Sequence, residues 1–226
     1  MPLKVYCCCT YRTTGRDWSP KDWAACFFIK ALKNKPLKGY ARITLPGNRI
    51  EKIENATADQ APQWFAAIAA DRIRWSTVGP AALVPIPDSS CSTESTAVPR
   101  TVSMARCLAS LLASQCVMAD VLRWIQAMPA SHQSGGTRDP YMLLDFLRCT
   151  APIDTARKVM LIDDVLSSGA HLRAATALLT RLGTQVTGAI CAGRADNEFV
   201  GQDAFVGRLE ILPDLEPITF DDIAPY

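Results

Sequence analysis

Apolar runs and amphipathic stretches alternate along most of the chain. Short continuous apolar runs predict buried strands, and these are residues 81–86, 159–162, 185–192 and 208–212. Apolar residues spaced three and four apart predict helices, and these are residues 61–73, 101–114 and 171–182. Strands that alternate with helices are typical of a mostly parallel sheet with helices on both faces, so we expect an α/β fold.

The N-terminal pattern differs, with short strands around a single helix. Ser19 and Pro20 form a helix start, because serine caps a first turn and proline is accommodated there. The helix is expected to end before Pro36. Residues 38–54 then predict a hairpin that turns at residues 46–48, where proline, glycine and asparagine follow one another.

Charge divides the chain at about the same place. Residues 1–58 hold 11 basic and 4 acidic residues, a net of +7, and residues 59–226 hold 13 basic and 18 acidic residues, a net of −5. The net charge of the whole chain is only +2, which argues against a dedicated nucleic-acid coat. We therefore expect a small basic subdomain, residues 1–58, and a body, residues 59–226. The basic segment is either a solvated face or a flap that attracts a polyanionic small molecule.

Several classes of protein and site are disfavoured by composition. No apolar run approaches the roughly 18 residues that span a bilayer, and the first residues lack the apolar core of a signal peptide. The nine cysteines form no CxxC pair, which disfavours a zinc site. Most are expected to be small buried residues in a reducing cytoplasm. Only two histidines occur, which excludes a histidine-rich metal centre.

The most informative segment for chemistry is Val159–His171. Four apolar residues are followed by Asp163 and Asp164, then by a turn that holds two serines and Gly169, and then by a helix. Backbone N–H groups, hydroxyls and a helix N-terminus that meet at one point form a cradle for a phosphate, which glycine lets approach closely. Adjacent carboxylates can accept hydrogen bonds from two vicinal hydroxyls, directly or through Mg²⁺. The alternative interpretation is a purely structural turn and helix cap.

This arrangement resembles the signature of type I phosphoribosyltransferases, which bind 5-phosphoribosyl 1-pyrophosphate (PRPP). It matches twelve of thirteen positions and departs at His171, where the family usually has threonine or serine. Residues 83–90 resemble the family's pyrophosphate loop, and with residues 27–36 they are most similar to the ComF-like branch. The CxxC pairs that begin the ComF pattern are missing.

The resemblance covers roughly residues 60–195 and implies the type I phosphoribosyltransferase fold, a Rossmann-like, mostly parallel sheet flanked by helices. Residues 1–58 would be the hood, the subdomain that selects the acceptor. The implied activity is transfer of 5-phosphoribose from PRPP to a nitrogen acceptor, a nucleobase or a related small molecule, with release of pyrophosphate. The implied cofactor is Mg²⁺, and the implied assembly is a cytoplasmic homodimer with neither a membrane nor a nucleic-acid partner.

The resemblance also implies roles for individual residues. Asp163 and Asp164 would hold the ribose hydroxyls and Mg²⁺, directly or through water, and would favour a cationic sugar. The 5-phosphate would be bound by Val165, Leu166, Ser167, Ser168, Gly169, Ala170 and His171. The pyrophosphate and its metal would meet Asp88, Ser89 and Ser90. Arg138 and His132, on the polar loop 129–138, would close over the leaving group.

Three other functions stay open. The first is a non-catalytic PRPP-binding regulator, for which the basic segment would supply a nucleic-acid surface, although it lacks a helix-turn-helix pattern. The second is an interaction protein with a degenerate site, against which both acids of the motif are intact. The third is a different phosphate-binding α/β enzyme. The sequence does not identify the acceptor.

Overall fold

The computed structural model describes residues 2–15, 17–129, 137–198 and 203–215. The strands of its central sheet are β1 (Leu3–Tyr11), β4 (Ala81–Pro85), β5 (Cys116–Met118), β8 (Lys158–Leu166), β9 (Val186–Ala195) and β10 (Arg208–Leu212). Their order is β10-β1-β9-β8-β4-β5. Every neighbouring pair is parallel except β1 and β10, which are antiparallel. The mostly parallel sheet predicted from the alternating pattern is therefore confirmed.

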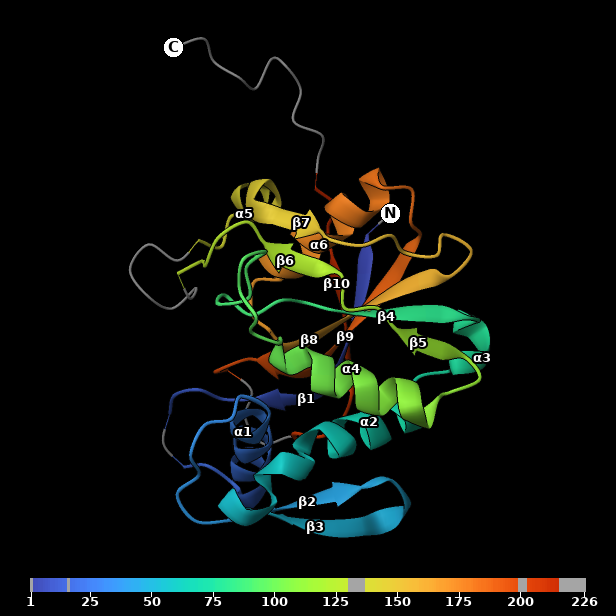
Figure 1. Ribbon diagram of the computed structural model, residues 1–226. Helices are drawn as coiled ribbons and strands as arrows, with labels where there is room; N and C mark the ends of the chain where they lie inside the picture. The colour runs from blue at the N-terminus through green and yellow to red at the C-terminus, as the bar shows by residue number, and fades with distance from the viewer. Residues whose placement is uncertain (1, 16, 130–136, 199–202, 216–226) are drawn as a thin grey trace.

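Helices cover both faces of this sheet, as Figure 1 shows. On one face lie α1 (Pro20–Leu32), α2 (Ala61–Arg72) and α4 (Arg100–Leu111), and on the other lie α5 (Pro140–Phe146) and α6 (Ala170–Arg181). One core contains Phe28 from α1, Trp64 from α2 and Met104 from α4, and the second contains Leu143 from α5 and Leu172 from α6. The molecule is thus a three-layer α/β structure.

The smaller elements lie outside these layers or join them. Two antiparallel pairs are formed by β2 (Ala41–Leu45) with β3 (Arg49–Ile53) and by β6 (Leu122–Trp124) with β7 (Leu147–Cys149). Short helical turns occur at η1 (Pro46–Asn48), η2 (Asn55–Gln60) and α3 (Trp75–Val78). In the part of the chain that the structure describes, no helix is long and apolar enough to cross a membrane.

The first strand corrects the predicted boundary of the basic subdomain. β1 lies between β9 and β10, so residues 3–11 belong to the central sheet and not to a separate N-terminal part. Cys7, Cys8 and Cys9 are completely buried in it, because free cysteine packs as a small apolar residue. All nine cysteines are free and seven are buried, as expected from composition. What remains of the segment beside the sheet is α1 with the β2–β3 hairpin.

The predicted N-terminal elements form for the expected local reasons. Ser19 Oγ accepts from the backbone N–H of Asp22 at 3.2 Å, and the Asp22 carboxylate accepts from the backbone N–H of Ser19 at 2.8 Å. This reciprocal pair fixes the start of α1. The hairpin turns at residues 46–48 as predicted, where Gly47 adopts φ +74°. After Pro140, α5 ends at Phe146, and the chain continues directly into β7, which pairs with β6.

The topology places a crevice between β4 and β8. After β4 the chain passes into α4 on one face, whereas after β8 it passes into α6 on the opposite face. Because the two connections diverge, a gap opens outside the carboxyl ends of these neighbouring strands. The loops that follow β4 and β8, in which the sequence predicts the candidate chemistry, therefore meet at one edge of the sheet.

Candidate active site

A cleft of about 810 Å³ opens at this edge. Most of the residues predicted for the site line it, namely Asp88, Ser89, Arg138, Asp163, Asp164, Val165, Ser167, Ser168, Gly169, Ala170 and His171. Two predicted residues do not: Leu166 is 2% exposed and packs in the core beneath the turn, and Ser90 is exposed outside the cleft. His132 lies outside the described residues.

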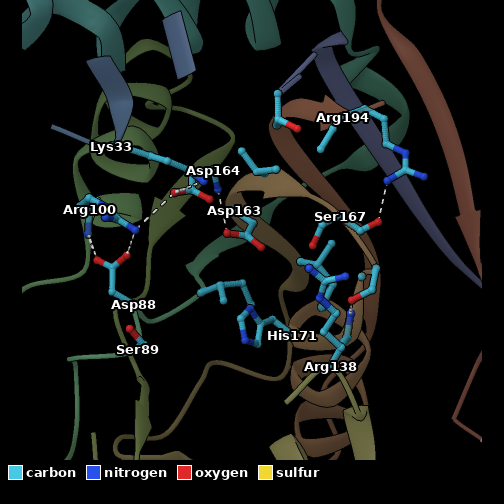
Figure 2. A pocket seen from close by; sticks show the side chains of 18 of the residues that line it. Lys33, Asp88, Ser89, Arg100, Arg138, Asp163, Asp164, Ser167, His171 and Arg194 are labelled. Atoms are coloured by element: carbon cyan, nitrogen blue, oxygen red, sulfur yellow. Dashed lines mark hydrogen bonds and ion pairs between the residues drawn. The ribbon is translucent and has the colours of Figure 1, made fainter. Parts of the chain in front are cut away.

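The two adjacent acids lie near the end of β8. Asp163 Oδ1 accepts a hydrogen bond of 2.7 Å from the backbone N–H of Asp164 (Figure 2). Burial, followed by the charge of Asp164, raises the pKa of Asp163 well above its usual range, while this hydrogen bond and Lys33 act in the opposite direction. Negative charge on the pair is therefore costly, and a cationic group in the cleft would relieve that cost.

Arg100 joins the loops of the two strands. Its Nη2 forms an ion pair with Asp88 Oδ1, and the same nitrogen lies 3.4 Å from Asp164 Oδ2 (Figure 2). Lys33, just after α1, approaches Asp164 Oδ2 more loosely, at 3.9 Å. The carboxylate of Asp164 thus faces two cations, one from α4 and one from the N-terminal segment.

Asp88 also has a structural task. Its Oδ2 accepts from the backbone N–H of Arg100 at 2.8 Å, which satisfies one of the free N–H groups at the start of α4. Next to it, Thr101 Oγ1 donates to the carbonyl of Ile86 at 2.7 Å. The Arg100 side chain is 36% exposed and that of Asp88 only 15%, so Arg100 is the more accessible of the two to a ligand.

The turn after β8 presents backbone donors to the cleft. Gly169 stands at the N-cap of α6 with φ +77°, a left-handed conformation that favours glycine. Ser168 Oγ accepts a long hydrogen bond of 3.4 Å from the N–H of Ala170. The first turn of a helix has N–H groups without intrahelical partners and the positive end of the helix dipole, which together favour an anion.

Arg194, at the end of β9, binds the carbonyl oxygens of this turn. Its Nη1 donates to the carbonyl of Ser167 at 2.6 Å (Figure 2) and to that of Leu166 at 3.2 Å. Its Nε lies 3.6 Å from Glu210 Oε1 on β10. Because the carbonyl oxygens of the turn are bound by Arg194, the turn is fixed with its donors available to a ligand.

His171 occupies the first turn of α6 beside the acids. Its ring lies 5.5 Å from the ring of Trp124, measured between centroids. Burial lowers the pKa of His171, and the charge of Asp164 opposes this shift only in part. The side chain is therefore neutral at physiological pH and can donate a single N–H, as a hydroxyl at this position would.

The charge of the cleft lining is mixed but predominantly basic. Five basic side chains line it, namely Lys33, Lys35, Arg100, Arg138 and Arg194, against the three carboxylates Asp88, Asp163 and Asp164. Tyr40, on the hairpin of the basic segment, does not line the cleft: it is 58% exposed and its ring faces Arg42 and Lys52. The lining fits a ligand with several negative charges and a part rich in hydroxyls.

Sequence reasoning missed Arg100, Arg194 and the end of β1, where Tyr11 and Thr13 line the cleft. A signal existed for Arg194, because it follows a predicted buried strand and the carboxyl ends of parallel strands meet at one edge. Arg100 is the last residue of a polar loop and precedes a predicted helix, and this position is a weaker indication of a role in the site. Tyr11 could not be found while β1 was assigned to a separate subdomain.

Comparison with known proteins gave matches among solved structures only. No family model matches the chain, and no curated protein matches it. The chain is similar to an adenine phosphoribosyltransferase from Thermoanaerobacter pseudethanolicus at 16% identity and a TM-score of 0.41, over 74% of this chain and 99% of that one.

Two further solved structures are similar at comparable levels. A hypoxanthine phosphoribosyltransferase from Staphylococcus aureus has 14% identity and a TM-score of 0.36, over 64% of this chain and 78% of that one. An orotate phosphoribosyltransferase from Francisella tularensis has 19% identity and a TM-score of 0.34, over 74% of this chain and 69% of that one. These matches do not single out the ComF-like branch. All three likenesses have identities of 14–19% and TM-scores of 0.34–0.41.

Proposed function

We propose that the chain is a phosphoribosyltransferase that transfers 5-phosphoribose from PRPP to a nitrogen acceptor and releases pyrophosphate. The observation that supports this most is the cleft at the β4–β8 crevice, where two adjacent carboxylates, a helix N-terminus and five basic side chains face one space. PRPP carries its phosphate, its ribose hydroxyls and its pyrophosphate in one molecule, so it requires all three kinds of partner together.

The 5-phosphate would bind at the turn that Arg194 fixes. Ser167, Ser168 and the backbone N–H groups at the start of α6 would donate to its oxygens. His171 would add a neutral N–H donor from the same first turn. Hydrogen bonds from rigid backbone groups to a charged phosphate are among the strongest that a protein makes without a metal.

The ribose would lie against Asp163 and Asp164. In the displacement, the bond from C1 of the ribose to the pyrophosphate oxygen breaks, its electron pair leaves with pyrophosphate, and the acceptor nitrogen forms the new bond and loses its proton. The sugar becomes cationic as the leaving group departs, and the negative charge of the two carboxylates would stabilise that state.

The pyrophosphate would face Arg100, Ser89 and Arg138. Arg100 is held on two sides, by Asp88 and by Asp164, so its position is fixed before the ligand arrives. Arg138 has no hydrogen bond or ion pair with any residue that the structure describes, and it is thus available to neutralise the leaving group.

The residues of the cleft are compatible with Mg²⁺. Within the described ranges, no group of three or more histidine, cysteine or acidic side chains could form a complete metal cage. Mg²⁺, however, is commonly held by one or two carboxylates together with water and substrate phosphates. Asp163 and Asp164 would hold it, directly or through water, and it would supply positive charge beside the ribose and the leaving pyrophosphate.

The acceptor would enter from the side of the N-terminal segment. The phosphate turn and the acid pair recognise phosphate and hydroxyls, so acceptor choice must come from other residues. Tyr11, Thr13, Lys33 and Lys35 line that side of the cleft. We expect a homodimeric, cytoplasmic enzyme, as the family resemblance implies.

A pyrophosphate-release assay tests the proposed function. The protein is incubated with PRPP and Mg²⁺ against a panel of purines, pyrimidines, modified bases and amines, and calorimetry measures PRPP binding in parallel. Release that depends on one acceptor class is the expected result. Binding of PRPP without turnover on the whole panel would favour the regulatory alternative, and no binding of PRPP would contradict both.

The positions of the lysines predict a salt-dependent effect. The double substitution Lys33→Gln and Lys35→Gln is expected to raise KM for PRPP about tenfold at roughly 10 mM ionic strength, because both lysines line the cleft and PRPP is polyanionic. The effect should shrink at about 150 mM, where the Debye length falls from about 30 Å to about 8 Å.

A charge-matched control separates local from general attraction. Lys30 and Lys38 belong to the same segment but do not line the cleft, so Lys30→Gln with Lys38→Gln should change KM far less. Equal effects of the two double variants in steady-state kinetics would mean that only the net charge of the segment matters.

A further inference from the structure

Arg100 lies between two carboxylates in the way that a bridging cation would. Its Nη2 pairs with Asp88 Oδ1 from the loop after β4, and it lies 3.4 Å from Asp164 Oδ2 at the end of β8. The two acids are largely buried, with side chains 15% and 13% exposed. Two carboxylates facing each other at the crevice would repel, so the guanidinium stabilises their approach.

The guanidinium of Arg100 has N–H donors that these two ion pairs do not use. A guanidinium has five N–H donors in a planar fork, and Nη2 accounts for the contacts with both acids. Arg100 Nε is buried and finds no hydrogen-bond partner among the residues that the structure describes. A buried donor without a partner is costly, so the ion pairs of Nη2 must hold the side chain in this position. Arg100 lines the cleft.

We propose that Arg100 takes the place of a bridging cation between Asp88 and Asp164, and that the cleft therefore binds pyrophosphate without a divalent metal ion. The inference deepens the proposed function, on which its choice of anion rests. The guanidinium stays charged at every physiological pH, so its charge depends neither on protonation nor on metal supply. Lys33, at 3.9 Å from Asp164, adds a second fixed charge. A metal on the ribose side, beside Asp163, is compatible with this assignment.

The first experiment needs no variant. The wild-type protein is titrated with inorganic pyrophosphate by calorimetry, once with excess EDTA and once with Mg²⁺. Binding in EDTA within about tenfold of the affinity with Mg²⁺ is expected, because Arg100 already supplies the cation. Binding that appears only with Mg²⁺ overturns the proposal.

Three variants then assign the effect to Arg100. Arg100→Gln should weaken pyrophosphate binding in EDTA at least tenfold, and Arg100→Lys should weaken it less, because lysine keeps the charge but loses the fork. The control is Arg157→Gln, since Arg157 pairs with Asp154 outside the cleft and its side chain is 33% exposed against 36% for Arg100. This control should bind as wild type does. Unchanged binding by Arg100→Gln overturns the assignment, and thermal unfolding followed by circular dichroism verifies that each variant is folded.

A titration with metal alone gives an independent readout. Mn²⁺ binding is followed by electron paramagnetic resonance without any phosphate ligand. Arg100→Gln removes the guanidinium that pairs with Asp88 and Asp164, so the variant should bind Mn²⁺ at least ten times more tightly than wild type. Equal Mn²⁺ affinities would show that Arg100 does not occupy a cation position.

Failure of this inference differs from failure of the proposed function. An enzyme that releases pyrophosphate from PRPP but binds pyrophosphate only with Mg²⁺ retains the proposed function and refutes the inference. A protein that binds pyrophosphate in EDTA through Arg100, but neither binds nor consumes PRPP, retains the inference and refutes the proposed function.

Discussion

Replacing Asp163 and Asp164 together by asparagine is expected to lower the rate of phosphoribosyl transfer by a factor of about 10³ or more. The substitution preserves size and leaves oxygens that can still accept hydrogen bonds, including the one that Asp163 accepts from the backbone N–H of Asp164. It removes the negative charge that, in the proposed mechanism, would stabilise the cationic sugar. The loss should therefore appear in kcat more than in the binding of the phosphate groups.

The same substitution is expected to stabilise the folded protein. Burial and the neighbouring Asp164 raise the pKa of Asp163 in the folded state above that of an unfolded carboxyl, which is about 3.9. The folded state thus binds more protons than the unfolded state in the pH window above about 4, and the free energy of unfolding falls as pH rises through that window to the folded pKa. Asparagine has no such titration, so the variant should gain roughly 1–3 kcal/mol at neutral pH.

Both parts of this prediction are measurable on one preparation. Pyrophosphate release gives the rate, and urea unfolding at pH 5 and pH 8 gives the change of stability with pH. Asp154→Asn is a suitable control, because Asp154 is exposed and pairs with Arg157 outside the cleft. A double variant with the wild-type rate would remove the acids from the mechanism, and one less stable at pH 8 would show that the buried charge is compensated.

The sequence predicted the parts of the site that are contiguous in the chain. Residues 159–171 form a strand that carries the acid pair near its end, then a turn and the start of a helix, and local preferences alone determine that order. The loop after Pro85 was predicted for a related reason, since it follows another buried strand. Alternation of strands and helices then implied that both loops share one edge of the sheet.

The remaining residues of the site depend on contacts between distant segments. Arg100 meets Asp164 across 64 positions, and Arg194 meets Ser167 across 27. The position of Arg194 after a predicted buried strand and that of Arg100 before a predicted helix indicate the edge of the sheet, but not the partner that either arginine contacts. The place of β1 in the central sheet was missed for a different reason, because residues 1–58 as a whole, with their short strands, were assigned to a separate subdomain. The predicted subdomain boundary at residue 58 was based on the distribution of charged residues. Charged residues mostly face solvent, so their distribution does not reveal a buried strand such as β1.

Gly169→Val is expected to weaken PRPP binding by about 2 kcal/mol, the order of losing one charge-assisted hydrogen bond, and to destabilise the fold by about 2–4 kcal/mol. Gly169 has φ +77°, which a β-branched residue rarely adopts. A Cβ added there would also overlap the side chain of Leu212 on β10. The added side chain therefore meets β10 and not the phosphate, so the loss of affinity comes from displacement of the turn that Ser167 and Arg194 fix.

Two comparisons separate strain, packing and binding in this prediction. Gly183, at the other end of α6, has φ +82° and open space where a Cβ would lie, with no heavy atom within 4 Å. Gly183→Val should therefore lose only the conformational part, about 1–2 kcal/mol, and leave PRPP affinity unchanged. Adding Leu212→Ala to Gly169→Val makes room beside β10, so PRPP affinity measured by calorimetry should recover in part. If Gly169→Val binds PRPP as wild type does, the turn after β8 is not the phosphate site. If Leu212→Ala restores nothing, the displacement does not arise from β10.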